Sequence, residues 1–241
     1  MGKDFSFLFV LNLDIGPMRI LFQGDSITDG NRYKSKETEW DKNHQIGHSY
    51  AYIVTGILSA AYPERGYEFM NRGVSGDRTD QLLARWQEDA LALSPDVLSV
   101  LVGINDCMFQ DRNGTLDPEA VAYERNYREI LTLSRQQTPD LKIVLLEPFA
   151  HVAGQKNAVS PAAMRERMIR SEQRIVRQLA DEFQAIFVPL QAVFDEAMTR
   201  REPSYWIWDG THPTEAGHAL IANQFLRYTR GIFGYEKDLL A

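Results

Sequence analysis

The stretch MRILFQGDSITDG, from Met18 to Gly30, joins a short apolar run to a turn that contains two glycines. Arg19 to Phe22 has the composition of a buried β-strand. Gly24 and Gly30 punctuate the turn that follows, which favours a Ser26 hydroxyl presented at the edge of a sheet rather than inside it. The stretch therefore predicts a strand that delivers a polar side chain to a loop.

The rest of the chain repeats this arrangement, because short apolar runs alternate with longer amphipathic segments. That rhythm predicts an α/β domain in which βα units surround a parallel sheet buried on both faces. The predicted strands are Arg19 to Phe22, Tyr67 to Met70, Val97 to Val102, Lys142 to Glu147 and Ala185 to Val188. The predicted helices are Ser49 to Ala61, Thr79 to Leu93, Pro118 to Gln137, Pro161 to Phe183 and Thr214 to Arg230. No linker or internal repeat interrupts the pattern, so residues 18–241 are predicted to form a single domain.

Residues 1–17 are interpreted as an N-terminal extension, because Met18 begins a segment typical of a normal N-terminus. Within it, Phe5 to Leu11 is apolar but far shorter than the ~20 residues that a bilayer span requires. The segment lacks an Ala-x-Ala-like cleavage site before Pro17, so we expect no signal peptide and a cytoplasmic location. A secretory segment is the weaker alternative, and a leader, a tag remnant and a misassigned start are all compatible with the extension.

The composition, with 44% hydrophobic and 24% charged residues, is that of an ordinary globular domain. There are 26 lysines and arginines against 33 aspartates and glutamates, which gives a net charge of −7. An acidic protein has no general attraction for phosphate backbones or anionic membranes, so we expect no nucleic-acid and no membrane partner. The single Cys107 excludes an intramolecular disulfide and a cysteine-rich zinc site.

Four polar clusters are expected to meet at one edge of the predicted sheet. They are Gly24 to Ser26 after the first strand, Ser75 to Asp77 after the second, Gly103 to Asp106 after the third, and Asp209 to His212 before the last helix. In an open α/β sheet, ligands bind beyond the carboxyl ends of the strands, where the connections diverge. This edge is therefore the predicted functional site.

Ser26, His212 and Asp209 are the candidate catalytic residues. A neutral imidazole can accept the proton of a serine hydroxyl and later deliver it to a leaving alcohol. An aspartate three residues before the histidine can reach Nδ1 of the ring, fix its tautomer and stabilise the imidazolium. The alternative makes Ser26 a helix cap and Asp209 part of a surface turn. The occurrence of both features in one α/β chain favours the catalytic interpretation.

Attack on an ester creates an oxyanion, which needs hydrogen-bond donors aimed at it. The candidate donors are the backbone amides of Ser26 and Gly76 and the side-chain amide of Asn105. Gly76 can approach a ligand closely because glycine has no Cβ atom. A simple turn at Gly76 and a loop cap at Asn105 are the alternatives.

The motifs GDSITDG (24–30), NRGVSGDRT (71–79), GIND (103–106) and DGTHP (209–213) resemble the four blocks of the SGNH hydrolases, also called GDSL esterases and lipases. The resemblance spans residues 18–231. It implies a flavodoxin-like three-layer α/β/α sandwich with a five-stranded parallel sheet in the order 2-1-3-4-5. Ile27 stands where the name-giving motif has leucine, and both residues are apolar.

The resemblance also implies a role for each candidate residue. Ser26 is the nucleophile, His212 the general base and Asp209 the residue that orients it, while Gly76 and Asn105 complete the oxyanion hole with Ser26. Gly73 is a rival for the glycine position, although the segment 75–77 matches the family block better.

Within the family, residues 71–106 and the Trp208-Asp209 pair are similar to intracellular carbohydrate esterases that remove acetyl groups from xylo-oligosaccharides. Trp208 is the predicted substrate-binding residue. Together with Tyr205, Trp206 and Phe109 it could form a wall for sugar stacking or acyl packing. Core packing is the alternative for each of these aromatic residues.

Several further residues are interpreted structurally. Asp25, Gly103 and Asp106 flank the candidate catalytic residues and are predicted to support their loops, the two aspartates through hydrogen bonds to backbone amides. Cys107 is predicted to be a small buried thiol. The charge-rich segment Glu166 to Arg177 is predicted to be a solvated helix face.

His44 and His48 lie among acidic residues but match no strong zinc spacing, so no metal is expected. A charged loop explains the composition of residues 31–48, and whether this loop forms a lid is left open.

The sequence thus predicts a serine esterase that removes acetyl groups from small carbohydrates through an acyl-enzyme and needs no cofactor. A lipase, lysophospholipase or thioesterase with the same residues is one alternative. Another is a non-catalytic flavodoxin-like protein whose Gly24 to Gly30 loop cradles a phosphate. An Asp-x-x-His motif has no use in a phosphate site, and the glycines match neither the P-loop nor the dinucleotide pattern. The natural ester and a homo-oligomeric assembly are left open.

Overall fold

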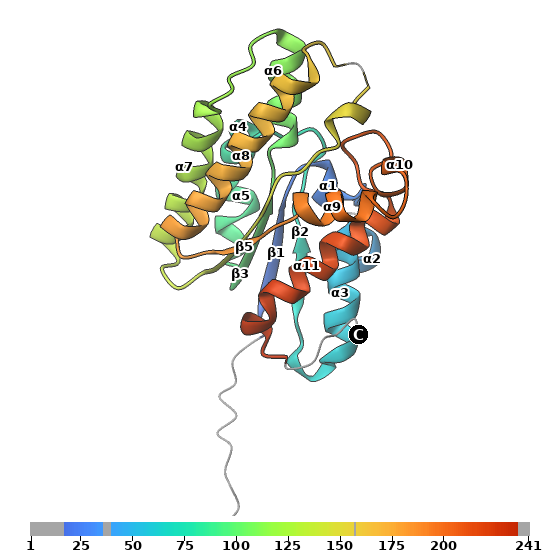
Figure 1. Cartoon of the computed structure of the whole chain (residues 1–241). Coiled ribbons are helices and arrows are strands. Elements are labelled where there is room, and N and C mark those ends of the chain that lie inside the picture. Colours follow the sequence, from blue (N-terminus) through green and yellow to red (C-terminus); the bar gives the residue numbers. More distant parts are fainter. Residues whose placement is uncertain (1–16, 36–39, 157, 236–241) are drawn as a thin grey trace, which may run out of the picture.

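The computed structural model describes residues 17–35, 40–156 and 158–235, and a parallel sheet of five strands forms its centre (Figure 1). The strands are β1 (Arg19–Gly24), β2 (Glu68–Asn71), β3 (Val97–Leu101), β4 (Lys142–Leu146) and β5 (Ile186–Val188). They lie in the order β2-β1-β3-β4-β5, and each pair is parallel. The predicted fold class and strand order are therefore confirmed.

Helices cover both faces of the sheet and make it the middle of three layers (Figure 1). The layer on one face contains α3 (Tyr50–Ala61), α9 (Gln191–Met198) and α11 (Glu215–Phe233). The other contains α4 (Thr79–Ala84), α5 (Trp86–Asp89), α7 (Val121–Gln137) and α8 (Ala162–Glu182). Leu21 and Phe22 of β1 belong to different core clusters, because successive side chains of a strand point to opposite faces. Both clusters are fully buried at this strand, which anchors the start of the first loop.

Shorter elements fill the connections. They are α1 (Ser26–Asp29), α2 (Lys42–Ile46), η2 (Pro63–Arg65), η3 (Leu91–Leu93), α6 (Ile104–Asn113), η4 (Val152–Gly154) and α10 (Pro203–Trp206). In Figure 1, α1 and α10 lie toward the same end of the molecule, where the carboxyl ends of the strands are found. This end carries the predicted site.

The segment predicted as one helix from Thr79 to Leu93 is divided into α4, α5 and η3. The first break falls at Arg85, which has non-helical backbone angles. Its guanidinium donates to the Asp77 carboxylate at 2.6 Å and to the Arg72 carbonyl at 2.8 Å. These contacts to the loop after β2 replace the continuous helix that the local pattern favours.

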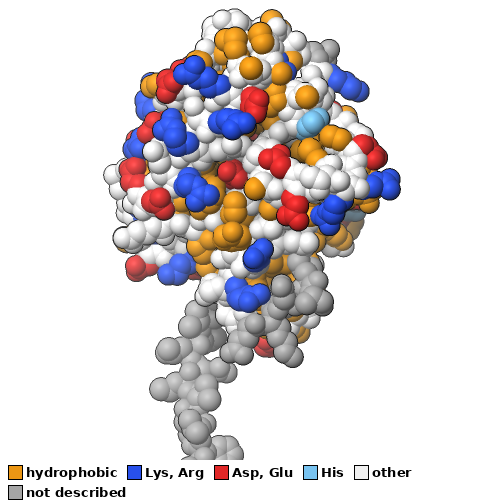
Figure 2. All heavy atoms as spheres, in the orientation of Figure 1, with side chains coloured by type: hydrophobic (Ala, Val, Ile, Leu, Met, Phe, Trp, Pro, Cys, Tyr) orange, Lys and Arg blue, Asp and Glu red, His pale blue; other side chains and the backbone are white. Residues whose placement is uncertain are grey.

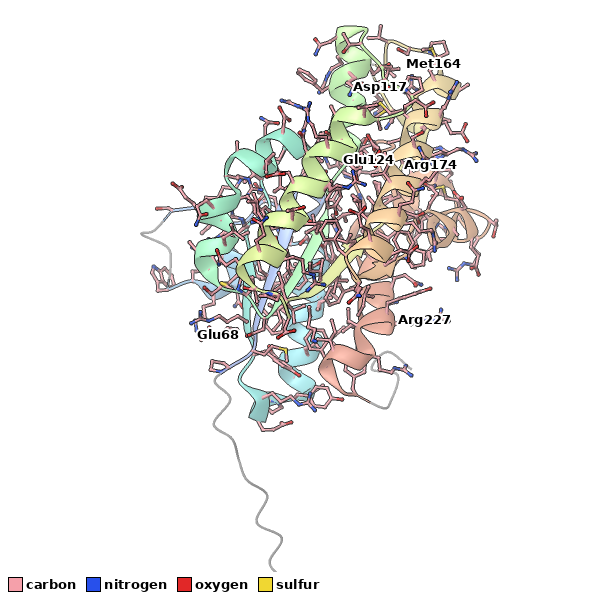
Figure 3. The ribbon with its side chains drawn as sticks, turned by 90° about the vertical axis from the view of Figure 1, so that its left-hand side faces the viewer. Glu68, Asp117, Glu124, Met164, Arg174 and Arg227 are labelled. Atoms are coloured by element: carbon pink, nitrogen blue, oxygen red, sulfur yellow. The ribbon has the colours of Figure 1, made fainter. Side chains whose placement is uncertain are left out.

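The outer helices α7 and α8 run side by side, as the labelled Glu124 and Arg174 show in Figure 3. The prediction of a solvated face for Glu166 to Arg177 holds for Arg170 and Arg174, which are exposed. It was wrong for Glu172, whose exposed fraction is 0%. Glu172 shares the buried stripe of α8 with Met168, Ile175 and other apolar residues, because positions three or four apart lie on the same helix face.

Among the described residues, no helix has both the length and the apolar character that a membrane span demands. Most of the predicted extension, residues 1–16, lies outside the described residues. The single domain over 18–241 stays a prediction.

Candidate active site

Ser26 is placed by the junction of β1 and α1. β1 ends at Gly24, whose backbone angle φ is +153°, and a Cβ atom there would lie 2.1 Å from the Leu101 carbonyl oxygen of β3. Only glycine fits this close approach of two strand ends. The carboxylate of Asp25 then caps α1 by accepting a hydrogen bond of 2.9 Å from the Ile27 amide. Ser26 consequently opens a one-turn helix at the carboxyl edge of the sheet.

Ser26, His212 and Asp209 form one hydrogen-bonded chain. Ser26 Oγ lies 2.9 Å from His212 Nε2, although 186 positions separate the two residues in the sequence. His212 Nδ1 lies 2.7 Å from Asp209 Oδ2. Since an ionised carboxylate only accepts hydrogen bonds, Nδ1 carries the proton and Nε2 is free to accept the serine proton. The arrangement can therefore generate a nucleophilic serine oxygen.

Asp209 is held in its ionised form. Partial burial acts to raise its pKa, but hydrogen bonds from the His212 amide, the His212 ring and the Thr211 amide outweigh burial and lower the pKa. The two amides donate to Asp209 Oδ1 at 2.7 and 3.0 Å. One carboxylate oxygen thus fixes the turn, and the other orients the imidazole.

Trp208 stacks on His212, the middle residue of this hydrogen-bonded chain. The two ring centres are 5.6 Å apart, and the ring planes are inclined by 20°. Trp208 is 58% exposed, so much of the indole is available to a ligand. Of the other predicted wall residues, Phe109 lies under the Arg78 guanidinium, 4.0 Å from ring centre to Cζ, and Tyr205 packs edge-on against Trp206.

Of the two further donors predicted for an oxyanion, Gly76 lies in the loop between β2 and α4, and Asn105 lies in the first turn of α6. Gly76 has φ of +87°, and open space surrounds the position of a Cβ atom there. A Cβ atom at its rival Gly73 would lie 2.5 Å from the Asp29 amide nitrogen, so Gly73 serves the packing of α1. Asn105 Nδ2 donates to the Asp77 carbonyl at 3.2 Å. A primary amide has two N–H donors. This contact occupies one of them and leaves the second available to a ligand.

Two residues that support these loops escaped the sequence interpretation. Asn71, at the end of β2, donates to the carbonyls of Thr28 and Ile46, both at 2.7 Å. The buried Asp29 accepts from the amide and the hydroxyl of Ser75 at 3.0 and 2.9 Å. The signal was present, since both residues lie inside the quoted motifs, but their partners are distant in sequence.

Behind the loops lie three carboxyl groups, of Asp25, Asp106 and Glu172, which we call the buried carboxyls. Burial raises the pKa of Asp25 to about 7, assisted by the nearby Asp106 and Asp77 charges, and it raises that of Asp106 to about 7 as well. Asp106 accepts from the Thr79 hydroxyl at 2.6 Å and from the Thr79 amide. The two aspartates thus bind backbone amides of the loops.

Glu172 differs from both aspartates, because neither of its carboxyl oxygens has a hydrogen-bond partner among the described residues. Burial raises its pKa well above the ordinary value, and the Asp106 and Asp25 charges add to this effect. Its Oε2 packs against Gly103, where a Cβ atom would lie 3.0 Å away. Gly103 is the N-cap of α6, so Glu172 contacts the turn that carries Asn105.

The remaining predictions concern residues away from this chain. Cys107 is buried, as predicted. His44 Nδ1 lies 2.6 Å from Asp41 Oδ2, and its ring stacks on Tyr33. Within the described ranges, no three histidine, cysteine or acidic side chains gather as a metal site requires. The segment 31–48 contains α2, but its residues 36–39 lie outside the described residues, so the question of a lid stays open.

Comparison with known proteins identifies relatives over almost the whole chain. Residues 22–220 match the GDSL-like lipase/acylhydrolase family. An acetylxylan esterase of Geobacillus stearothermophilus is 37% identical over 210 residues, which cover 87% of this chain and 92% of that enzyme. The resemblance carried by the four motifs is thereby confirmed.

Solved structures agree with this assignment. A protein assigned as a GDSL-like lipase from Parabacteroides merdae superposes with a TM-score of 0.78 at 33% identity, covering 88% of this chain and 95% of that chain. A variant of the acetylxylan esterase Axe2 from G. stearothermophilus gives a TM-score of 0.76 at 34% identity, covering 92% and 97%. Axe2 variants described as catalytic mutants have a histidine, an aspartate three positions before it, or a serine replaced by alanine, and this structure is the histidine variant.

Proposed function

Because the chain belongs to the GDSL-like lipase/acylhydrolase family of ester hydrolases, we propose that it removes acetyl groups from small carbohydrates such as xylo-oligosaccharides. The observation that carries the proposal is the hydrogen-bonded chain from Ser26 through His212 to Asp209. The serine, aspartate and histidine replaced in the Axe2 catalytic mutants have the same residue types and the same three-residue spacing. The similarity to an acetylxylan esterase supports the choice of ester.

In the proposed reaction, Ser26 Oγ attacks the carbonyl carbon of the acetyl ester while His212 Nε2 takes the hydroxyl proton. The tetrahedral intermediate collapses, the sugar hydroxyl leaves with the proton from His212, and the acetyl group stays on Ser26. A water molecule, deprotonated by His212, then attacks the acetyl-enzyme, and His212 returns the proton to Ser26 Oγ as the ester bond breaks and acetate leaves. Asp209 keeps the imidazole in the required tautomer and stabilises the imidazolium in both steps.

The oxyanion of each tetrahedral intermediate is proposed to receive the amides of Ser26 and Gly76 and the free N–H of Asn105. In the described part of the chain, neither backbone amide donates a hydrogen bond to another residue. Such preorganised donors stabilise charge that exists only in the transition state. The supporting residues Asp25, Gly103 and Asp106 hold the loops from behind.

Trp208 is proposed to bind the sugar. Its exposed indole lies against His212, where a stacked pyranose ring would place an acetylated hydroxyl near Ser26. The lipase and thioesterase alternatives use the same catalytic groups, but the acetylxylan esterase relative favours the carbohydrate ester. The phosphate-binding alternative has no role for the His212–Asp209 pair. A cytoplasmic location and a homo-oligomer stay predictions.

The test is an acetate-release assay on acetylated xylo-oligosaccharides, simple sugar acetates and lipid esters, with Ser26→Ala alongside. We expect release from the carbohydrate esters and at least ~10⁴-fold slower turnover by the variant, whose folding is checked by circular dichroism. Faster cleavage of C8 than of acetyl esters, with micelle activation, would replace the proposal by the lipase alternative. Parental turnover by folded Ser26→Ala would refute the mechanism.

A further inference from the structure

A cavity of about 270 Å³ adjoins the proposed catalytic residues. It lies where α6 faces the segment after η4 and the loop before α11, and Trp208 and Asp209 form part of its wall. A substrate stacked on Trp208 would therefore extend directly into this cavity. Its remaining wall includes Arg112, Gln155 and Lys156.

Three cations line this cavity: Arg112, Lys156 and the buried Arg165, whose charge acts to lower the pKa of Asp111. Arg112 and Lys156 are exposed, and neither forms an ion pair with a described residue. Some arginines elsewhere are paired, as Arg128 is with Glu182 at 3.0 Å, and others such as Arg227 form no ion pair with a described residue. On the face shown in Figure 2, basic side chains lie among acidic ones. In a chain with a net charge of −7, two unpaired cations beside one cavity indicate a local attraction for anions.

Two acids, Asp111 and Asp209, also line the cavity, and both accept hydrogen bonds from neighbouring residues. Asp111 is buried, and its two oxygens accept from the Val159 and Ser160 amides, both at 2.8 Å. Asp209 is bound to His212. The wall therefore carries three cations, Arg112, Lys156 and Arg165, against these two ionised carboxylates, which leaves an excess of one positive charge.

An unused donor also belongs to this wall. Gln155 Oε1 accepts from Arg165 Nε at 3.1 Å, which fixes the orientation of the amide. Gln155 Nε2 is inaccessible to solvent and has no acceptor among the described residues. A buried donor without a partner costs free energy, so this amide is a destabilising feature of the wall.

We infer that this cavity binds a carboxylate carried by the substrate itself, so that the preferred substrates are acetylated oligosaccharides bearing a uronic acid. Arg112 and Lys156 supply the charge, and Trp208 holds the neighbouring sugar ring. Charge-assisted hydrogen bonds to a carboxylate are the strong ones among polar contacts. This inference rests on the proposed deacetylase function and assigns a substrate class to it.

The experiment compares kcat/KM for acetate release from two xylo-oligosaccharide acetates of equal length, with and without a glucuronic acid branch. The parent is expected to prefer the acidic substrate about 10-fold, the effect of one net charge-assisted contact. Arg112→Gln combined with Lys156→Gln is expected to reduce the preference to about 2-fold or less, mainly through KM. Because partly exposed charges are screened by salt, 0.5 M NaCl should shrink the parental preference as well.

The control is Arg227→Gln combined with Lys142→Gln, which makes the same change in net charge at exposed positions. Figure 3 shows Arg227 on α11 toward the opposite end of the molecule from Met164, the residue before Arg165. The control should keep the 10-fold preference. A control that loses it to the same extent would show a general charge effect and overturn the inference.

The other outcomes are separable. Equal parental rates on both oligosaccharides would overturn the carboxylate site and leave the deacetylase function standing. Cleavage of p-nitrophenyl acetate without acetate release from any carbohydrate would overturn both. If free acetate inhibits the parent but not the Arg112 and Lys156 double variant, and no substrate preference exists, the cavity binds the product and the substrate inference is wrong.

Discussion

At the rim of the site, Asp209 receives three hydrogen bonds, whereas Glu172, one of the buried carboxyls behind the site, receives none from the described residues. Burial acts in the same direction on both groups, because it disfavours the charged form. The pKa of Asp209 is nevertheless lowered, and that of Glu172 is raised well above its ordinary value. The supply of donors, and not the depth alone, decides which carboxyl is ionised.

Asp25 and Asp106 lie between these extremes. Each accepts a backbone amide, yet burial raises the pKa of each to about 7. The comparison shows two kinds of carboxyl: an ionised carboxylate orients the imidazole at the rim, and three carboxyls with raised pKa values lie behind the proposed oxyanion donors. A full negative charge in that space would oppose the developing oxyanion.

The largest loss of activity is expected from replacing Asp209, the ionised carboxylate at the rim of the site. Asp209→Asn keeps an oxygen that can accept hydrogen bonds from the Thr211 and His212 amides. Its NH₂ group, however, cannot accept a hydrogen bond from the N–H at His212 Nδ1. The imidazole then loses the correct tautomer, and we expect kcat to fall by about 10⁴-fold. Steady-state kinetics on p-nitrophenyl acetate measures this, with the exposed Asp140→Asn as the matched control. A loss smaller than 10-fold would remove Asp209 from the mechanism.

The second-largest loss of activity is expected at Asn105, the proposed side-chain donor to the oxyanion. Asn105→Ala removes one donor to the oxyanion, and we expect kcat to fall by about 10²- to 10³-fold with a much smaller change in KM. Asn113→Ala, at the other end of α6, is the control for helix stability. If KM instead rises while kcat is retained, Asn105 binds the ground state and the oxyanion role is wrong.

For the buried side of the comparison, the prediction is a gain in stability. The pKa of Glu172 is higher in the folded than in the unfolded protein, so its contribution to stability is present below its ordinary pKa of 4.5 and is lost as pH rises above that value. Glu172→Gln cannot ionise and should escape the loss. We expect the free energy of unfolding to exceed the parental value by on the order of 1 kcal/mol at pH 8 and not at pH 4.5.

Urea unfolding at the two pH values measures this difference, and the exposed Glu88→Gln serves as the control. A Glu172→Gln variant that is less stable than the parent at pH 8 would mean that the ionised carboxylate has a partner, such as a buried water, and the contrast with Asp209 would disappear.

The smallest effect should follow from the outermost rim residue. Trp208→Leu removes the aromatic face above His212, and we expect KM for an acetylated xylo-oligosaccharide to rise by about 2- to 10-fold, the range of one aromatic contact. Tyr228→Leu, an exposed aromatic residue of α11, is the control. A drop in kcat alone would assign Trp208 to positioning of the imidazole rather than to sugar binding.

Local patterns accounted well for the strands and poorly for several helices. All five strands lie within two residues of their predicted bounds, because buried parallel strands are short, apolar and bounded by polar loops. α6 was read only as the GIND motif, since its sequence INDCMFQDRN has few apolar residues. α9 was likewise not predicted. The helix expected over 79–93 is broken at Arg85, whose partners Asp77 and Arg72 are not visible in the local pattern.

The sequence by itself determined the α/β class, the order of the motifs and the residue types of the site, because periodicity and turn chemistry are local properties. Only the tertiary structure decided that Ser26 Oγ lies 2.9 Å from His212 Nε2, since that contact depends on the strand order and on loops 186 residues apart. It alone showed that Glu172, in a charge-rich helix, is buried without a partner. Burial depends on how the layers pack together, and the sequence of one helix does not specify which of its side chains a neighbouring element will cover.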